Sequence, residues 1–214
     1  MKTIYCISGL GADERAFSRL KLEGYEISCL PWLIPLPNET IKDYAIRMSK
    51  GITDEKPVLM GLSFGGMMCI EISKLLPVEK LILISSIKSG RELPRWMKLA
   101  GILRLNKIFP MRSFKITEPL QNRFIGISAP EEIEMVRSYR RNAPQPYMDW
   151  AINEVLKWRN DWHPPTLYHV HGDADRIFPI NNLAPTHIIK DGGHFMIINK
   201  AAEVNAALED IVAS

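Results

Sequence analysis

The chain has 214 residues, 46% of them hydrophobic and 24% charged, with a net charge of +3, which is the composition of an ordinary single globular domain. So small a charge does not favour a nucleic-acid partner. No apolar run approaches the ~20 residues of a membrane-spanning helix, so we expect neither nucleic-acid nor membrane binding. Cys6, Cys29 and Cys69 lie far apart among apolar residues, and the N-terminus shows no secretory leader. We therefore expect a cytoplasmic protein with buried thiols.

Six short, largely apolar runs predict strands that are buried on both faces of a sheet. The expected strands are Thr3–Ile7, Tyr25–Leu30, Pro57–Leu62, Lys80–Ser85, Thr166–Val170 and Thr186–Ile189. Helical patterns separate most of them, so the order of elements predicts a parallel sheet with helices on both sides. In such a sheet, the loops that carry chemistry gather at the carboxyl ends of the strands.

Capping residues and helical periodicity predict the helices. Asp13 is expected to cap a short helix. Thr40 with Asp43 forms a weak capping box for a helix that ends at Gly51. Asn199 is expected to cap a terminal helix with one apolar face. The other expected helices are Met67–Leu76, Arg95–Phe109 and Glu131–Arg141.

Residues 86–165 interrupt this alternation, because they contain helical patterns and no convincing strand. The segment is too long for a bare loop in a compact domain, so we expect a helical cap inserted into a core formed by residues 1–85 and 166–214. It carries 14 Lys and Arg against 8 Asp and Glu, a net charge of +6. This charge has two interpretations: a solvated helical face, or a surface that attracts an anionic substrate or an acidic carrier protein.

The segment Gly61-Leu62-Ser63-Phe64-Gly65 fits the pattern G-x-S-x-G between a predicted strand and a predicted helix. A sharp turn at this place raises the serine hydroxyl above the backbone and puts the following N–H at a helix N-terminus. A side chain at position 61 or 65 would collide with the neighbouring strand or helix. The alternative interpretation is a glycine-rich turn that holds an ordinary serine.

A serine nucleophile needs a base, and the base needs an acid that holds its tautomer. His194 follows the last predicted strand between glycines and is the favoured base. Asp173 and Asp175 both follow the fifth predicted strand, and either can be the acid. His171 stands at a strand end, where a structural hydrogen bond is the commoner role. The remaining histidines lie inside strands or in a Pro-rich loop: His169, His187 and His163.

The oxyanion of an acyl-transfer reaction needs two hydrogen-bond donors. The backbone N–H of Phe64 is one expected donor. By position, the backbone N–H of Leu10, in the turn after the first strand, is the other. Taken alone, the turn Ser8-Gly9-Leu10-Gly11 is equally typical of a plain strand-to-helix connection. No pair of Cys or His residues has the spacing of metal ligands, so we expect no metal.

Together these residues resemble the α/β-hydrolase superfamily, in its carboxylesterase-like branch. The resemblance is carried by Ser8-Gly9-Leu10-Gly11, Gly61-Leu62-Ser63-Phe64-Gly65-Gly66, His171-Gly172-Asp173-Ala174-Asp175 and Gly193-His194. It implies an α/β-hydrolase fold of about six mainly parallel strands with a helical cap, and no cofactor. It also implies a catalytic triad of Ser63, Asp175 and His194. The branch includes hydrolases of small acyl esters and of carrier-protein esters.

Two departures from the family pattern stand out. The first turn reads Ser8-Gly9 where the family often has His-Gly, which leaves the shape of that loop open. The chain also begins at what resembles the family's third strand, so we expect a more exposed sheet edge that a homodimer would cover. Serine at position 63 differs from the Asp of similar epoxide hydrolases and dehalogenases and from the Cys of dienelactone hydrolases.

These features predict a serine hydrolase that cleaves a small-molecule carboxylic ester through an acyl-enzyme. An acidic acyl carrier protein is a further expected partner, suggested by the basic insertion. The same triad would serve a thioesterase, a lyase or an acyltransferase, and the scaffold would also suit a non-catalytic ligand-binding protein. Sequence alone leaves these alternatives open.

Overall fold

The computed structural model describes residues 1–103 and 114–214. A six-stranded sheet with the order β2-β1-β3-β4-β5-β6 forms its centre, and every neighbouring pair of strands is parallel. All six predicted strands are present, with ends shifted by at most two residues. The strands are β1 (Lys2–Ile7), β2 (Tyr25–Cys29), β3 (Val58–Leu62), β4 (Lys80–Ile84), β5 (Leu167–Gly172) and β6 (His187–Ile189).

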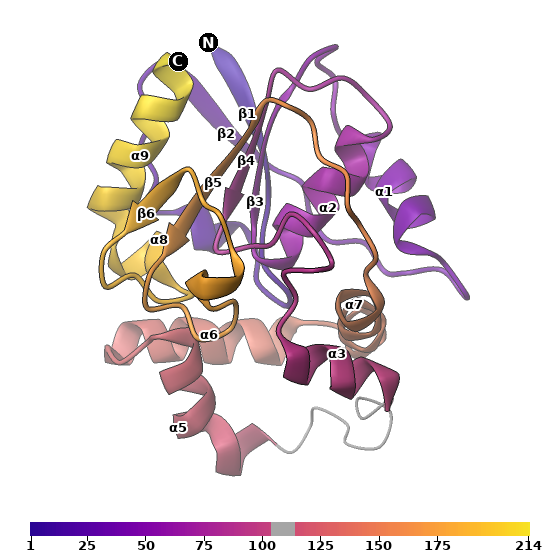
Figure 1. The fold of residues 1–214 in the computed structure, drawn as a ribbon, viewed down its shortest axis with the longest axis vertical. Coiled ribbons are helices and arrows are strands. Elements are labelled where there is room, and N and C mark those ends of the chain that lie inside the picture. The colour runs from indigo at the N-terminus through magenta and orange to yellow at the C-terminus, as the bar shows by residue number, and fades with distance from the viewer. Residues whose placement is uncertain (104–113) are drawn as a thin grey trace.

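Alternating side chains of the central strands feed two separate hydrophobic cores, one on each face of the sheet. In β1, Ile4 and Cys6 belong to one core, while Tyr5 and Ile7 belong to the other. Figure 1 shows α1 and α2 on one face and α9 on the other. The elements that flank the sheet are η1 (Glu14–Phe17), α1 (Ile41–Ser49), α2 (Phe64–Ser73), η3 (Ile180–Asn182), α8 (Met196–Asn199) and α9 (Ala201–Ala213).

Between β4 and β5 the described residues form helices and no strand, in agreement with the predicted helical insertion. The helices are α3 (Arg95–Ile102), α5 (Phe114–Ile125), α6 (Pro130–Asn142) and α7 (Gln145–Lys157). Figure 1 shows all four at the end of the molecule toward which the strands run, opposite the N-terminus. The insertion therefore stands over the carboxyl ends of the parallel strands, where reactive loops gather.

Several predicted helix boundaries differ from the structure. Helix α2 begins at Phe64, three residues before the predicted start. Helix α3 ends at Ile102, and the predicted continuation from residue 104 to Phe109 lies outside the described residues. Helices α5 and α7 were not predicted, since Pro119 lies inside the first and Pro144 directly precedes the second.

The predicted cap of the terminal helix is wrong. Asn199 is the last residue of α8, and Lys200 occupies the N-cap position of α9 without a side-chain hydrogen bond. The Asn199 side chain instead donates a hydrogen bond of 2.9 Å to the carbonyl oxygen of Gly126, just beyond α5. The Asn199 side chain thus bonds to a residue that is distant in the chain and not to the start of the next helix. Helical periodicity cannot reveal such a partner.

None of the helices in residues 1–103 and 114–214 is long and apolar enough to cross a membrane.

Candidate active site

Ser63 stands at the turn between β3 and α2 in a strained backbone conformation. Its φ is +53° and its ψ is −117°, a combination that non-glycine residues rarely adopt. The surrounding backbone holds it there. The Ser63 N–H donates to the carbonyl oxygen of Ile84 (2.9 Å), and the Ser63 carbonyl oxygen accepts from the Ser86 hydroxyl (2.6 Å) and from the Gly66 N–H (3.0 Å). The turn fixes the serine at the N-terminus of α2.

The two glycines of the motif are required by close backbone approach. A Cβ at Gly61 would collide with the backbone of Gly65 and Gly66 in α2. A Cβ at Gly65 would collide with the carbonyl oxygens of Ile7 and Ser8 at the end of β1. The collisions predicted from the sequence are thereby confirmed, and they show that the helix packs directly against the neighbouring strand end.

The structure brings Ser63, His194 and Asp175 into one chain of hydrogen bonds. His194 Nε2 lies 2.9 Å from Ser63 Oγ, and His194 Nδ1 lies 2.8 Å from Asp175 Oδ2. Because the carboxylate only accepts, Nδ1 carries the proton and Nε2 is free to accept the serine proton. The arrangement joins loops after β3, β5 and β6, three places that lie far apart in the sequence.

Asp175 is held as a carboxylate inside the protein. Its side chain is 0% exposed, against 13% for His194. The other oxygen, Oδ1, accepts from the N–H groups of Ile177 (2.7 Å) and Phe178 (3.0 Å). Burial opposes ionisation, but the charge and hydrogen bond of His194, with help from His171 and the Phe178 N–H, bring the pKa of Asp175 below its ordinary value.

The two candidate acids have different partners in the structure. Asp173, the alternative acid, accepts a hydrogen bond of 2.7 Å from the Asp191 N–H and so ties its turn to the loop that follows β6. Asp175 is the carboxylate that contacts His194. This contact agrees with the acid that the family resemblance implies, whereas position alone left both acids open because they follow the same strand.

His171, the alternative base, has a structural position behind the site. It is buried, and its Nε2 donates to the carbonyl oxygen of Phe178 (2.8 Å), while its Nδ1 lies 3.2 Å from His169 Nε2. Burial lowers the pKa of His171, although Asp175 and the Phe178 carbonyl act in the opposite direction. Both buried histidines, His169 and His171, are therefore neutral near pH 7. His187, on the edge strand β6, is only half-buried.

The two expected oxyanion donors lie beside the serine. Phe64 is the first residue of α2, so its N–H has no acceptor within the helix. A Cβ added to Gly9 would lie 3.6 Å from Ser63 Cβ, which places the turn after β1 next to the nucleophile. In the described part of the chain, the Leu10 N–H makes no hydrogen bond. These two N–H groups are therefore free to bind a substrate oxygen.

Ser8 shapes that turn where the family often has histidine. Its hydroxyl donates to the carbonyl oxygen of Ala12 (2.7 Å) and accepts from the indole N–H of Trp32 (3.0 Å). The Ala12 N–H donates to the Gly9 carbonyl oxygen (3.0 Å), which closes the turn. A small hydroxyl thus connects the turn to the start of the loop after β2. Sequence reasoning did not identify this role of Ser8, because its partner Trp32 is distant in the chain.

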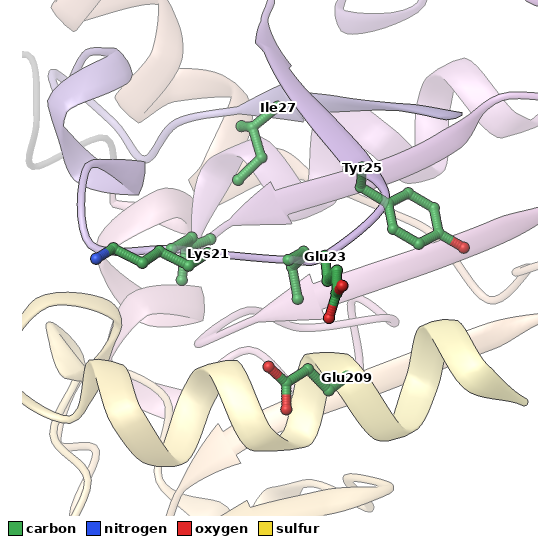
Figure 2. A pocket seen from close by; sticks show the side chains of 7 residues that line it. Lys21, Glu23, Tyr25, Ile27 and Glu209 are labelled. Carbon is green, nitrogen blue, oxygen red and sulfur yellow. The ribbon is translucent and has the colours of Figure 1, made fainter. Parts of the chain in front are cut away.

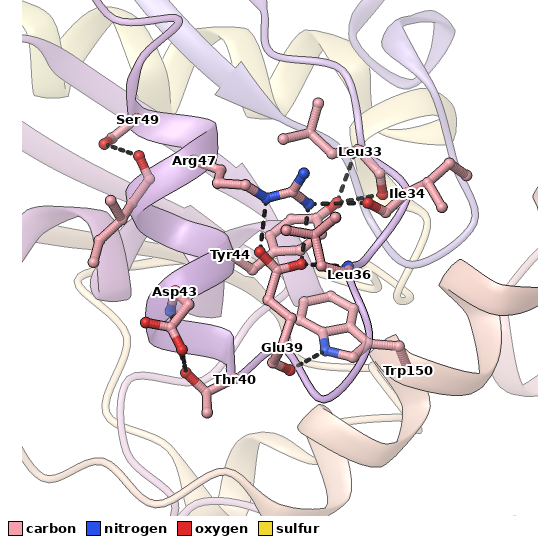
Figure 3. A network of polar contacts seen from close by, with 11 residues as sticks. Leu33, Ile34, Leu36, Glu39, Thr40, Asp43, Tyr44, Arg47, Ser49 and Trp150 are labelled. Atoms are coloured by element: carbon pink, nitrogen blue, oxygen red, sulfur yellow. Dashed lines mark hydrogen bonds and ion pairs between the residues drawn. The ribbon is translucent and has the colours of Figure 1, made fainter.

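An aromatic wall stands next to the serine. The ring of Trp32 stacks on Phe64 with centroids 5.1 Å apart and an interplanar angle of 9°, and it lies at the same distance from Tyr147 of α7. Figure 3 shows how the segment after Trp32 is held. There the buried Glu39 pairs with Arg47 (2.7 Å), and its carbonyl oxygen accepts from the Trp150 indole (2.9 Å). The network joins this loop to α1 and to the insertion.

Two hollows differ sharply in position. One, of about 350 Å³, lies between the turn after β1, the end of β2 and the junction of α6 with α7. The other, of about 580 Å³, lies beside the start of β2 and α9, toward the opposite end of the same strand. Figure 2 shows Glu23 and Glu209 on facing sides of this second hollow, with Lys21 at one end. The second hollow contains none of the predicted site residues.

The donor set is suited to proton transfer and covalent chemistry. Among residues 1–103 and 114–214, no three His, Cys, Asp or Glu side chains are grouped as metal ligands would be. A strained serine, an imidazole in contact with it, a buried carboxylate and two free N–H groups are the parts that acyl transfer requires.

Comparison with known proteins agrees with this fold. A family model described as "Alpha/beta hydrolase family" matches residues 7–207. No curated protein matches the sequence. A thermophilic esterase from Thermogutta terrifontis aligns with a TM-score of 0.73 at 18% identity, over 100% of this chain and 90% of its own.

Two further solved structures carry other activities in their names. A bromoperoxidase from Bacillus anthracis aligns with a TM-score of 0.74 at 16% identity, over 100% of this chain and 92% of its own. An epoxide hydrolase from Bacillus megaterium aligns with a TM-score of 0.67 at 11% identity, over 100% and 94%. At these identities the likeness shows a common fold, on which the chemistry differs from protein to protein.

Proposed function

We propose that this chain, which belongs to the alpha/beta hydrolase family, is a serine hydrolase that cleaves carboxylic esters through an acyl-enzyme. The observation that supports the proposal most directly is the unbroken chain of hydrogen bonds from Ser63 Oγ through His194 to Asp175, at 2.9 and 2.8 Å. A structural serine has no need of a base in contact or of a buried carboxylate behind that base.

In the first step, Ser63 Oγ attacks the ester carbonyl carbon while its proton passes to His194 Nε2. Asp175 stabilises the imidazolium that forms. The carbonyl oxygen becomes an oxyanion, which accepts hydrogen bonds from the N–H groups of Leu10 and Phe64. The tetrahedral intermediate then collapses: the bond to the alcohol oxygen breaks, and the alcohol leaves with the proton from His194.

In the second step, His194 takes a proton from water, and the resulting hydroxide attacks the acyl carbon. The bond between Ser63 Oγ and the acyl carbon breaks, the carboxylic acid leaves, and the serine recovers its proton. Each donor to the oxyanion is worth on the order of 3 kcal/mol of barrier. Both donors are backbone groups, so the chemistry depends on the shape of the two turns and not on the side chains at positions 10 and 64.

We further propose that residues 86–165 act as a cap over this site, on the core formed by residues 1–85 and 166–214. The described helices of this segment stand over the carboxyl ends of the strands, which supports the assignment. The substrate in this proposal is a small-molecule ester that reaches Ser63 beneath the cap. The net positive charge of the insertion would also suit an acidic acyl carrier protein.

The test is rapid-mixing hydrolysis of p-nitrophenyl butyrate. The wild type should release a burst of p-nitrophenol equal to the enzyme concentration, followed by steady turnover. Ser63→Ala should lose both phases, and Asp175→Asn should lower kcat by ~10⁴-fold, because it loses the correct imidazole tautomer. Ser49→Ala, on the far end of α1, is the matched control.

Two outcomes would reject the proposal. Equal rates for wild type and Ser63→Ala would show that the hydrolysis does not use this serine. Stoichiometric labelling of Ser63 by a fluorophosphonate, without turnover of any ester, would instead favour a binding protein built on the same fold.

A further inference from the structure

The hollow of about 350 Å³ lies directly behind the turn that carries the Leu10 donor. Ser8 and Gly11 of that turn line it, together with Trp32 after β2. Its remaining wall comes from the insertion, where Tyr139 belongs to α6 and Tyr147 to α7. The hollow therefore lies beside the turn that follows β1, with walls from the core and from the insertion.

Two phenolic hydroxyls on its lining residues have no acceptor for their protons. Tyr139 is 5% exposed and Tyr147 2% exposed. Within the described part of the chain, neither hydroxyl donates to an acceptor, and only the backbone N–H of Gly11 approaches the Tyr147 oxygen. Burial raises the pKa of Tyr139 and of Tyr147 well above the ordinary value, so both remain protonated donors at any working pH. Leaving such groups unsatisfied is unfavourable, and a ligand that supplies an acceptor would remove that penalty.

The position of the base decides which half of the ester faces this hollow. His194 must protonate the leaving alcohol, so the alcohol lies on the side of the loops after β5 and β6. The hollow lies on the side of β1 and β2, beyond β3 and Ser63 in the order of strands. The acyl arm therefore points toward the hollow while the alcohol points toward His194.

The polar residues around the hollow favour a neutral arm. Asp13 is already paired with Arg15 at 2.6 Å, and the Arg15 guanidinium lies over the ring of Tyr139, 4.9 Å from its centroid. A cationic arm would therefore meet the guanidinium that already occupies the ring face, and an anionic arm would meet Glu14, which also lines the hollow. Two hydroxyl donors among apolar walls call for an uncharged acceptor atom, such as an ether, hydroxyl or carbonyl oxygen.

We propose that this hollow is the acyl subsite and that Tyr139 and Tyr147 select acyl arms carrying a neutral oxygen. The inference rests on the proposed ester hydrolysis and adds its substrate class. Both hydroxyls are closed off from solvent in the free protein, so the entering arm must part α6 and α7 slightly from the turn. The entering arm then supplies acceptors that the two hydroxyls lack in the free protein.

The test compares p-nitrophenyl hexanoate with its 4-oxa and 5-oxa analogues, in which one ether oxygen replaces a methylene. The arms are equal in length, and the oxygen is remote from the reacting carbonyl. For at least one analogue, the wild type should show a kcat/KM about three- to tenfold higher than for hexanoate. In the double variant Tyr139→Phe/Tyr147→Phe the ratio should fall to about one. Tyr168→Phe, whose hydroxyl contacts Ser214 on the surface, should keep the wild-type ratio.

Thermal unfolding of the same variants gives an independent readout. Removing an unpartnered hydroxyl should leave the Tm of Tyr147→Phe unchanged or slightly raised, whereas a fall of several degrees would show a structural partner and overturn the inference. Equal kcat/KM for hexanoate and both analogues in the wild type would also overturn it, with ester hydrolysis left standing. No turnover of any of the three esters would overturn the proposed function, and this inference with it.

Discussion

His171 Nε2 lies 3.4 Å from Asp175 Oδ2, the same carboxylate oxygen that lies 2.8 Å from His194 Nδ1. A second, buried imidazole thus stands behind the acid of the candidate triad. Its Nε2–H donates chiefly to the Phe178 carbonyl oxygen, at 2.8 Å. The Phe178 ring in turn packs edge-on against His194, with centroids 5.6 Å apart. His171 therefore holds in place the turn that carries both Asp175 and Phe178, the residue whose ring packs against His194.

Replacing His171 tests this orienting role. His171→Leu removes the Nε2 donor, so the turn at Asp175 should loosen and kcat should fall by about tenfold with little change in KM. His171→Gln keeps an N–H at a similar position and should recover most of the loss. Steady-state kinetics on p-nitrophenyl butyrate provides the measurement. Equal kcat for the Leu and Gln variants would show that the donor has no part in positioning.

The buried His169 should make the protein sensitive to acid. Burial, together with the neighbouring His171 and Lys88, lowers the pKa of His169 to about 3. In the unfolded chain an ordinary histidine titrates near pH 6.5, so below that pH the unfolded state binds a proton that the folded state refuses. The free energy of unfolding is therefore unaffected by the titration of His169 above about pH 6.5, and it decreases as the pH falls from there toward 3.

His169→Gln should flatten that dependence, since its amide can still donate to His171 but does not titrate. The free energy of unfolding, from urea titrations at several pH values, should fall less steeply than in the wild type by about 1.4 kcal/mol per pH unit between pH 6 and 4. Above pH 7.5 the difference between the two proteins should be constant. Parallel curves over the whole range would contradict the prediction.

Gly65→Ala should disrupt the turn that carries Ser63. The new Cβ would press on the carbonyl oxygens of Ile7 and Ser8, which are backbone atoms and cannot turn away. We expect a loss of at least about 3 kcal/mol in the free energy of unfolding, measured in urea. Gly24→Ala is the control, because Gly24 has a φ of +78° and open space around it, so only strain of about 1 kcal/mol applies. Similar losses in the two variants would argue against the steric explanation.

Asn199 should affect turnover more than stability. Its side chain donates to the Gly126 carbonyl oxygen (2.9 Å), and the nearby Phe195 N–H donates to the Ile125 carbonyl oxygen (3.0 Å), so the end of α5 is joined to the loop that carries His194. Asn199→Ala removes one of these links. We expect kcat to fall by about three- to tenfold while the Tm changes by only a few degrees.

The matched control is Asn205→Ala. Asn205 makes similar long-range hydrogen bonds on α9, away from the predicted site: its Nδ2 donates to the Arg19 carbonyl oxygen (3.0 Å), and its Oδ1 accepts from the Lys21 N–H (2.9 Å). It should lower the Tm by a similar amount and leave kcat at the wild-type value. If both variants lower kcat equally, the link to α5 has no special effect on His194.

Local pattern was sufficient for most of the fold. Each strand is a continuous apolar run because both faces of the sheet are covered, so its position can be found without tertiary information. Helices α5 and α7 escaped prediction, since prolines at 119 and 144 resemble loop signals in isolation. Packing of the insertion decided their conformation, and local propensity yields to such packing.

The sequence by itself determined the sheet and the strained turn at Ser63, because each depends on residues that are neighbours in the chain, and it predicted the order of a nucleophile, an acid and a base. Only the tertiary structure showed that Asp175 and not Asp173 contacts His194, placed His171 behind Asp175, and put Tyr139 and Tyr147 around one hollow. Those relationships join atoms that are distant in sequence. They depend on distances of a few ångströms across the end of the sheet, and no local pattern encodes such distances.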